Sequence, residues 1–270
     1  MNTIKIFLTK DEFDADKCLR SGQCFYWQKS LDTWYGFINN NFVSLIQTDE
    51  YIEVGGNVSE KDIRNYLDLD TDYNKMFDLN ILDGFELQCL QTGKGIRILN
   101  QDLLETILTL TLTQRQTMTR TEKVINAVKK DYGKKVKSGK VVSYSFPEFK
   151  KIKNISLEEC KSYGMGYRAK YFTGILEKIK EDPSVLEDIK SADYITAKKL
   201  LKTFPGIGNK VADCICLFAL HHLEAFPIDT HIKQLMDENN IEIKKYGNYA
   251  GVMQQYMFYT KAFAEGRDNI

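Results

Sequence analysis

The chain has 270 residues, of which 43% are hydrophobic and 27% charged, an ordinary composition for a globular protein of one large or two modest domains. Its 37 basic and 37 acidic residues give a net charge of zero, so binding to a polyanion would need a locally basic face. No apolar run approaches the roughly 20 residues that span a bilayer, and the start, MNTIKIFLTKDEFD, lacks a signal-peptide core. These features exclude a membrane protein and predict a cytoplasmic one, or a nuclear one in a eukaryote.

Charged residues and cysteines are unevenly spread along the chain. The segment from Lys129 to Lys153 contains nine lysines against two acids, whereas acids concentrate between Asp49 and Asp83. The lysine-rich segment predicts either a basic face that binds DNA or a solvated loop. The six cysteines include no C-x-x-C pair, and there are only three histidines. These spacings predict no metal site and favour free, mostly buried thiols.

Residues 1–56 read as strands, because aromatic and β-branched residues alternate there with period two. Three consecutive asparagines, Asn39 to Asn41, predict a tight turn between two of these strands. The expected strands are 5–8, 24–28, 33–38, 42–47 and 51–54. Short loops between them predict an antiparallel sheet.

From Ser59 onward the apolar spacing becomes helical. The longest early helix is expected at 102–112, where an apolar stripe of leucine and isoleucine predicts a buried face. Other helical segments are expected at 59–69, 72–79, 85–90, 168–180, 185–189, 192–203 and 252–263. The chain is therefore predicted to be α+β, with a β-rich domain at 1–85 and a helical domain at 86–270.

Two polar segments interrupt this helical region. Thr113-Gln114-Arg115-Gln116-Thr117 separates two helices, and Arg120 lies about one helical turn further on. The second segment, residues 164–171, reads Gly-Met-Gly-Tyr-Arg-Ala-Lys-Tyr. Residue spacing alone does not indicate a function for either segment.

The stretch from Phe204 to His231 predicts a helix, a glycine hairpin and a second helix. Exposed amides of the hairpin and the positive start of the second helix predict a seat for a phosphate group. Lys210 lies in the first turn of that helix, where the helix dipole and partial burial are both expected to lower its pKa. A lysine that loses its proton easily is typical of an amine nucleophile, although a solvated lysine is the alternative. Asp229 opens another helix and is compatible with both a cap and a catalytic carboxylate.

The glycine hairpin, Lys210 and the Pro-Ile-Asp triplet about twenty residues later resemble the helix-hairpin-helix–Gly/Pro-Asp superfamily of DNA glycosylases. The lysine is typical of its bifunctional glycosylase/lyase branch. The fuller strings PGIGNKVADCIC and PIDTH resemble the 8-oxoguanine DNA glycosylases in particular, and so does Ser-Gly-Gln-Cys-Phe-Tyr-Trp at residues 21–27. The likeness runs from about residue 20 to 260. The C-terminus lacks the cysteine cluster of the iron–sulfur members.

This resemblance implies a pocket for one extruded base. Guanine has an acceptor at N7, whereas 8-oxoguanine has an N–H there. The unobstructed carbonyl of Gly22 would therefore accept a hydrogen bond from the damaged base, which undamaged guanine cannot donate. Gln254 corresponds to an amide that binds the Watson–Crick edge. Cys214 and Phe258 correspond to residues on the two faces of the base, with core packing as the alternative for both.

The resemblance also implies contacts with the rest of the duplex. By position Arg115 corresponds to the side chain that fills the gap left by the extruded base. The family commonly has asparagine or glutamine there, so Gln114 or Gln116 could share the role. Residues corresponding to the set that reads the partner cytosine are Arg120, Tyr167 and Arg168. Those expected to contact the DNA backbone are Gly206, Gly208 and His231.

Taken together, the resemblance implies an enzyme that removes 8-oxoguanine opposite cytosine and then nicks the strand. Lys210 would attack the sugar, Asp229 would stabilise the positive charge, and no metal or organic cofactor would take part. The carbonyls of Lys202, Phe204 and Ile207 would offer a structural alkali-ion site. The expected partner is double-stranded DNA, the expected state a monomer, and the expected location the nucleoid or nucleus. The alternatives are a glycosylase for another damaged base and a non-catalytic DNA-binding protein.

Overall fold

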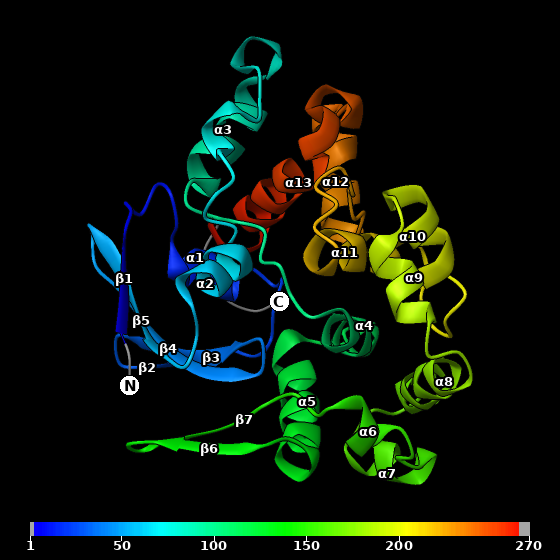
Figure 1. Ribbon diagram of the computed structural model, residues 1–270. Coiled ribbons are helices and arrows are strands. Elements are labelled where there is room, and N and C mark those ends of the chain that lie inside the picture. Colours follow the sequence, from blue (N-terminus) through cyan, green and yellow to red (C-terminus); the bar gives the residue numbers. More distant parts are fainter. Residues whose placement is uncertain (1–2, 265–270) are drawn as a thin grey trace.

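The computed structural model describes residues 3–264 of the chain. Figure 1 shows an antiparallel sheet on one side of the molecule, helices α8 to α10 on the opposite side, and α4 between them. The predicted α+β class is therefore confirmed, with the sheet at the N-terminus and helices after it. Within the described residues, no helix is both long and apolar enough to cross a membrane.

The sheet has five strands in the order β1-β5-β4-β3-β2, all antiparallel to their neighbours. In β3 every second residue is buried, which is the pattern that the sequence predicts. Gly36 of β3 is required for packing, because a Cβ there would lie 2.4 Å from the ring of Trp27. The strands are β1 (Thr3–Phe7), β2 (Gln28–Ser30), β3 (Thr33–Ile38), β4 (Asn41–Gln47) and β5 (Tyr51–Gly56).

The predicted strand at 24–28 is wrong. Residues 24–27 have no strand structure, and β2 begins only at Gln28. The aromatic side chains of this segment contact helical elements instead. Trp27 Nε1 donates to the hydroxyl of Tyr66 at 3.0 Å, and the Tyr26 hydroxyl donates to the Glu105 carbonyl at 3.1 Å. Tertiary packing of these rings therefore overrides their local preference for a strand.

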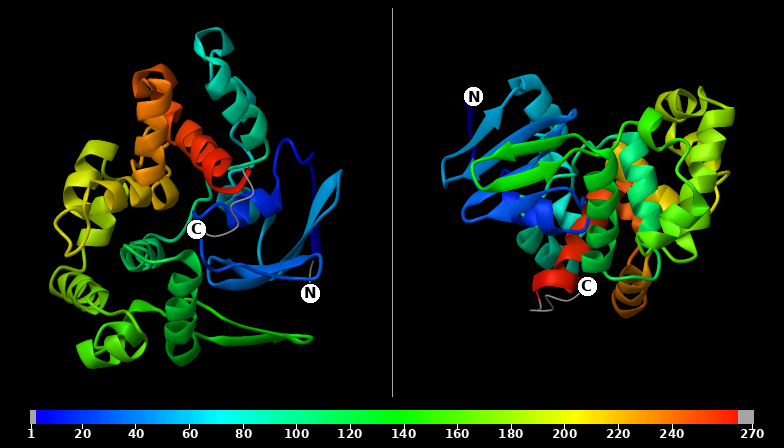
Figure 2. Two further views of the ribbon diagram at one scale, coloured as in Figure 1. Left: turned by 180° about the vertical axis from the view of Figure 1, so that it is seen from behind. Right: turned by 90° about the horizontal axis from the view of Figure 1, so that it is seen from below.

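One helix and one hairpin near the sheet were not predicted. Helix α1 (Ala15–Arg20) begins after Asp14, whose carboxylate accepts a hydrogen bond from Lys17 N at 3.0 Å. The hairpin of β6 (Lys135–Ser138) and β7 (Val141–Tyr144) lies within the lysine-rich segment and projects beside the sheet (Figure 2). Lys129, at the start of that segment, is only 2% exposed, so the segment is not simply a solvated loop.

The first helices begin at side-chain caps. Ser59, Asp83, Asp102 and Thr117 each accept a hydrogen bond from the backbone N–H three residues later. These helices are α2 (Glu60–Leu67), α3 (Gly84–Gly93), α4 (Leu103–Leu112) and α5 (Met118–Tyr132), with 3₁₀ turns at Tyr73–Lys75 and Leu79–Ile81. Helix α4 is buried on nearly every side, including three threonines, so it forms the centre of the helical region.

The remaining helices include the predicted pair around the glycine hairpin, α10 and α11. Helix α13 packs against α3, so the predicted domain boundary at residue 85 falls within a helix that contacts the C-terminal part of the chain. The helices are α6 (Phe149–Ile152), α7 (Leu157–Ser162), α8 (Arg168–Glu181), α9 (Val185–Ser191), α10 (Tyr194–Leu201), α11 (Asn209–Ala219), α12 (Thr230–Asn239) and α13 (Ala250–Tyr259), with a 3₁₀ segment at Ile243–Tyr249 and a π-helical turn at Thr260–Ala264. All six cysteines are free and buried, as predicted.

Candidate active site

A cavity of about 430 Å³ lies where the segment after α1, the loop between α4 and α5, and the first turns of α11 and α12 meet. Its volume is in the range typical of small-ligand sites. Residues from separate stretches of the chain, between Gly22 and Phe258, contribute to its wall, which explains why no single motif describes it. The sequence-predicted residues that line it are Gly22, Arg115, Lys210, Cys214, Asp229, His231 and Phe258.

The glycine hairpin before α11 has the geometry that the sequence predicts. Gly206 has φ +80°, and a Cβ there would lie 2.5 Å from the ring of Tyr171. Gly208 is the N-cap residue of α11, and no side chain caps this helix. The first amides of α11 therefore point outward beside a glycine that is exposed, an arrangement suited to a phosphate oxygen.

Lys210 is the second residue of α11 and is partly buried in the cavity wall. Cys214 lies one helical turn further on and lines the same cavity. The pKa of Lys210 is raised above its ordinary value, mainly by the negative charge of the Cys214 thiolate and further by Asp229, against the lowering effect of burial. The predicted lowering of this pKa is therefore wrong, because two neighbouring groups stabilise the ammonium.

Cys214 is buried, with 5% of its surface exposed. Burial raises the pKa of its thiol, and the ammonium of Lys210 only partly offsets that increase. The thiol is consequently protonated near neutral pH, and its attraction for the ammonium develops as the solution becomes alkaline. This residue therefore contributes both an apolar surface and a pH-dependent charge to the cavity.

Asp229 is the N-cap of α12, as predicted. Its Oδ1 accepts a hydrogen bond from Ile232 N at 2.8 Å. Within the described residues it forms no ion pair at 4.0 Å or less with Lys210, yet its charge contributes to the raised pKa of the lysine. The cap fixes the carboxylate at the cavity wall, from which its charge acts on Lys210.

Gly22 lies opposite these residues with φ +79°. A Cβ there would lie 3.4 Å from Phe258 and 3.5 Å from the sulfur of Met118. The neighbouring residues are held by buried hydrogen bonds, since Gln255 Nε2 donates to the Ser21 carbonyl at 2.9 Å and Gln101 Nε2 donates to the Gln23 carbonyl at 2.8 Å. This segment is therefore rigidly tied to both α13 and the chain before α4.

Gln254 does not line the cavity, unlike the other three predicted base-binding residues. It is only 4% exposed, and its Oε1 has no hydrogen-bond partner in the part of the chain that the structure describes. A buried, unpaired acceptor costs roughly 1–3 kcal/mol, so it calls for a ligand or a small movement that supplies a donor.

His231, on α12, lies edge-on to Phe258 with ring centroids 6.3 Å apart.

The three polar residues of the loop between α4 and α5 differ in their hydrogen bonds. The Gln114 amide donates to the Gly206 carbonyl at 2.8 Å, and the Gln116 amide donates to the Thr121 hydroxyl at 3.0 Å. Arg115 has φ +51°, and its exposed guanidinium forms no hydrogen bond or ion pair with another described residue. Of these three residues, only Arg115 has a side chain available to enter a DNA duplex.

Three further predicted residues lie outside the cavity. The buried guanidinium of Arg168 donates to the carbonyls of Gln114 and Arg115, the latter at 2.9 Å. Tyr167 is 49% exposed with its ring beside that guanidinium, whose Cζ lies 4.6 Å from the ring centroid, and Arg120 is exposed on α5. Arg168 thus supports the loop in this state, whereas Arg120 and Tyr167 are free to contact a partner strand.

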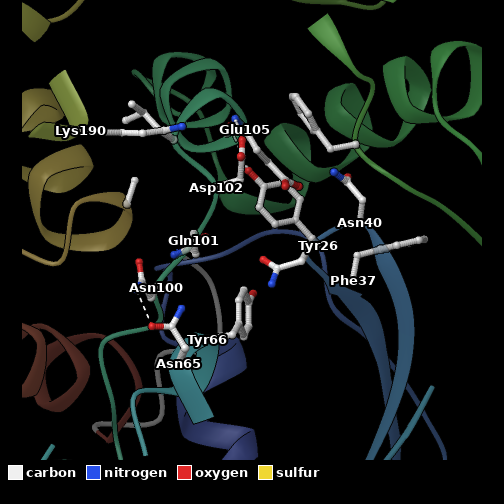
Figure 3. Close-up of a pocket in the computed structure, with 14 residues that line it drawn as sticks. Tyr26, Phe37, Asn40, Asn65, Tyr66, Asn100, Gln101, Asp102, Glu105 and Lys190 are labelled. Carbon is white, nitrogen blue, oxygen red and sulfur yellow. Dashed lines mark hydrogen bonds between the residues drawn. The ribbon is translucent and has the colours of Figure 1, made fainter. Parts of the chain in front are cut away.

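A separate cavity of about 380 Å³ lies at the other end of α4 (Figure 3). Its wall includes Tyr26, Asp102 and Glu105, and neither Lys210 nor Asp229. Burial raises the pKa of Glu105 to about 8, with Lys129 acting in the opposite direction. Its lysine, Lys190, is exposed and paired with Glu187 at 2.8 Å, and none of the sequence-predicted site residues lines this cavity.

Some contributors to the first cavity were not predicted as site residues. Met118 and Phe25 line it, and Gln255 holds the Ser21–Gly22 segment. A sequence signal existed for Met118, since it is the one apolar residue between the polar loop and the first turn of α5. Gln255 is adjacent to the predicted Gln254. The helix turns its side chain in a different direction, towards the Ser21 carbonyl.

Comparison with known proteins agrees with this geometry. Residues 5–107 match a family model described as the N-terminal domain of 8-oxoguanine DNA glycosylase. The chain is 27% identical to the N-glycosylase/DNA lyase of Saccharomyces cerevisiae over 86% of this chain and 69% of that protein. It is also 27% identical to the N-glycosylase/DNA lyase OGG1 of Arabidopsis thaliana, over 93% of this chain and 78% of that protein.

Among solved structures, the chain is similar to the 8-oxoguanine glycosylase/lyase of Clostridium acetobutylicum, determined with double-stranded DNA containing cytosine opposite 8-oxoguanine. The two share 28% identity and a TM-score of 0.85, over 94% of this chain and 93% of that one. The similarity thus covers both the sheet and the helical region.

Proposed function

Since the chain belongs to the 8-oxoguanine DNA glycosylase/AP lyase family, we propose that it excises 8-oxoguanine from duplex DNA and nicks the resulting abasic strand. One observation carries the proposal most directly. Lys210 and Asp229, an amine and a carboxylate from different helices, line the same base-sized cavity as Gly22. A protein that only binds DNA does not require an amine and a carboxylate together inside a cavity.

The cavity supplies the contacts that an extruded 8-oxoguanine needs. The Gly22 carbonyl accepts the N7 hydrogen that undamaged guanine lacks. Cys214 and Phe258 provide the apolar walls on either side of the ring. The unpaired Gln254 Oε1 accepts from a donor on the Watson–Crick edge once the base or the side chain moves into reach.

The reaction breaks one bond to the base and then one to the phosphate. The Lys210 nitrogen bonds to C1′ as the C1′–N9 bond breaks, and the bonding electrons leave with the base, which takes up a proton. Asp229 stabilises the positive charge that develops on the sugar. Opening of the sugar ring gives a Schiff base, loss of the C2′ proton forms a double bond to C3′, and the 3′ phosphate departs.

The raised pKa of Lys210 adds a proton-transfer step to this sequence. Only the neutral amine has the electron pair that attacks C1′, so the ammonium must lose a proton first. The reactive fraction is small at neutral pH and grows as the pH rises towards the pKa of Lys210. Excision is therefore faster in mildly alkaline solution than at pH 6.

The partner is double-stranded DNA, and the exposed groups around the cavity favour cytosine opposite the lesion. Arg120 and Tyr167 are the exposed members of the set that reads the partner base, and Arg115 fills the gap in the helix. The protein acts where the genome is, at the nucleoid of a bacterial or archaeal cell or in a nucleus. The amides of Gly206 and Gly208 contact the DNA backbone, with His231 beside them.

The hairpin can also hold a structural alkali ion, whereas the chemistry itself needs no cofactor. The Phe204 carbonyl accepts a hydrogen bond from Ile207 N, while those of Lys202 and Ile207 accept none in the described part of the chain. Free carbonyl oxygens are the ligands that such ions prefer. An ion held there would bring positive charge to the DNA backbone.

The substrate is tested with matched duplexes that differ in one base. Duplexes carrying 8-oxoguanine, undamaged guanine, an alkylated purine or an oxidised pyrimidine opposite its partner are incubated with the protein, and free bases are measured by mass spectrometry. Release of 8-oxoguanine alone is expected. Preferential release of another damaged base would point to the related glycosylase, and release of none would leave a DNA-binding protein.

A further inference from the structure

Besides the cavity of Figure 3, another of about 670 Å³, hereafter the second cavity, borders the proposed base pocket. Both cavities are lined by Gly22 and Met118, so these two residues form the wall between them. Residues that line only the second cavity include Arg20, Lys29, Trp34 and Thr119. The proposed reaction does not use this space.

The wall between the cavities is thin. Gly22 has no side chain, and the Met118 sulfur lies 3.5 Å from the point that a Gly22 Cβ would occupy. One flexible thioether and one stretch of backbone therefore separate the two spaces. Methionine has three rotatable side-chain bonds and no branch, so Met118 can change rotamer more easily than leucine or isoleucine could.

The reaction creates a need for such a passage. The nucleotide enters the base pocket while still attached to its strand, so DNA occupies the mouth through which it came. After the C1′–N9 bond breaks, the sugar is bonded to Lys210 and stays at that mouth. The freed base then lies between the bound sugar and the Gly22–Met118 wall.

The second cavity is suited to a flat, polar heterocycle. The Arg20 guanidinium and the Lys29 amine each lie 5.5 Å from the ring centre of Trp34. Asp16 accepts hydrogen bonds from both Trp34 Nε1, at 3.2 Å, and Lys29. Charged donors beside an aromatic wall can bind the carbonyl groups and the ring faces of an oxidised purine.

We propose that the excised base leaves through this second cavity, past Met118, while the DNA remains bound. The inference rests on the proposed excision of 8-oxoguanine. It assigns to Met118 the role of a gate and to the Arg20–Lys29–Trp34 group that of a transient base site. Under this arrangement, loss of the base does not have to wait for release of the nicked DNA.

The experiment uses a complex from which DNA cannot dissociate. A duplex with isotopically labelled 8-oxoguanine opposite cytosine is reacted with excess protein and borohydride, which reduces the Schiff base to a stable bond. The covalent complex is passed through a desalting column at successive times, and label is counted in the protein and free-base fractions. Thr119→Trp fills the second cavity from the exposed start of α5, and Thr119→Val is the matched control. Glu122→Trp, also at the second cavity and one turn further on, is an independent block.

We expect wild type and Thr119→Val to release the label from the covalent complex. In Thr119→Trp and Glu122→Trp release should slow at least about tenfold, which corresponds to roughly 1.4 kcal/mol of added barrier. Equal release by all four proteins would overturn the exit path, as would retention of the label by the wild-type complex. If the wild type yields neither free base nor covalent complex, the proposed function itself fails, so the two failures are distinguishable.

Discussion

The side-chain amide of Gln114 donates to the backbone carbonyl of Gly206 at 2.8 Å, which joins the loop after α4 to the glycine hairpin before α11. Arg168 holds the same loop by donating to the carbonyls of Gln114 and Arg115. The loop that is proposed to enter the DNA helix and the hairpin that is proposed to contact its backbone are therefore one connected unit. This connection leaves Arg115 as the side chain free to fill the gap.

The first prediction concerns this gap. Arg115→Ala should reduce excision from a fully paired duplex by roughly tenfold to a hundredfold, because filling the hole offsets part of the few kcal/mol that extrusion costs. The reduction should be much smaller when the lesion lies in an unpaired bubble, where extrusion costs little. Single-turnover excision rates on the two substrates measure the difference.

Gln114→Ala is the informative comparison for Arg115→Ala. It removes the bond to the Gly206 carbonyl and leaves Arg115 intact, so it should weaken binding to paired and unpaired substrates alike. Equal losses on both substrates for Arg115→Ala would contradict a gap-filling role.

The second prediction concerns the two roles of Asp229, as the cap of α12 and as a negative charge beside the sugar. Asparagine caps a helix about as well as aspartate, so Asp229→Asn should preserve α12 and the melting temperature. The lost charge should slow excision by roughly a hundredfold or more, as is typical when one preorganised electrostatic partner of a transition state is removed. Rates measured under single-turnover conditions, with unfolding followed by circular dichroism, check both parts. Near wild-type excision by this variant would remove Asp229 from the mechanism.

The third prediction concerns the opposite base. Wild type should excise 8-oxoguanine more slowly opposite adenine than opposite cytosine, because guanidinium donors match the acceptors of cytosine. Arg120→Ala should lower excision opposite cytosine and leave the adenine substrate nearly unchanged, since its side chain is exposed and forms no hydrogen bond or ion pair with another described residue. Arg168→Ala should lower both, because that side chain also supports the loop. A ratio of rates that Arg120→Ala does not alter would count against this assignment.

The sequence predicted best those features that depend on neighbouring residues. The helix pair around Gly206, the caps at Ser59, Asp102 and Asp229, and the buried face of α4 all follow from local spacing and capping chemistry. The residues around the cavity could be named as well, because the family resemblance supplied positions that spacing alone does not. Local signals sufficed wherever the determining contact lies within one helical turn.

Features decided by distant contacts were not predictable in this way. The aromatic residues 24–27 look like a strand, yet Trp27 and Tyr26 bond to Tyr66 and Glu105. The direction of the Lys210 pKa shift depends on Asp229, from another helix, and on how closely the Cys214 sulfur approaches the amine. Likewise, that Gln114 is engaged and Arg115 is free follows from a bond to a residue 92 positions away.

The fourth prediction uses the pKa of Lys210. Its neutral amine is the reactive form, so the rate of covalent trapping should rise with pH. Cys214→Ala removes the largest influence that raises this pKa, an influence that acts where the thiol is ionised, so in the alkaline part of the profile the rise should move to lower pH. Cys216→Ala, a buried cysteine of the same helix outside the cavity, should leave the profile where it is. A Cys214→Ala profile that stays in place or moves to higher pH would show that the thiol does not govern the amine.

The whole account depends on one covalent bond, between the nitrogen of Lys210 and C1′ of the damaged nucleotide. The most direct measurement mixes protein with a duplex carrying 8-oxoguanine opposite cytosine, adds borohydride and separates the products by denaturing electrophoresis. Wild type is predicted to give a protein–DNA band, and Lys210→Gln is predicted to give none while still binding the duplex. A band of equal strength from Lys210→Gln, or its absence from wild type, would contradict the account.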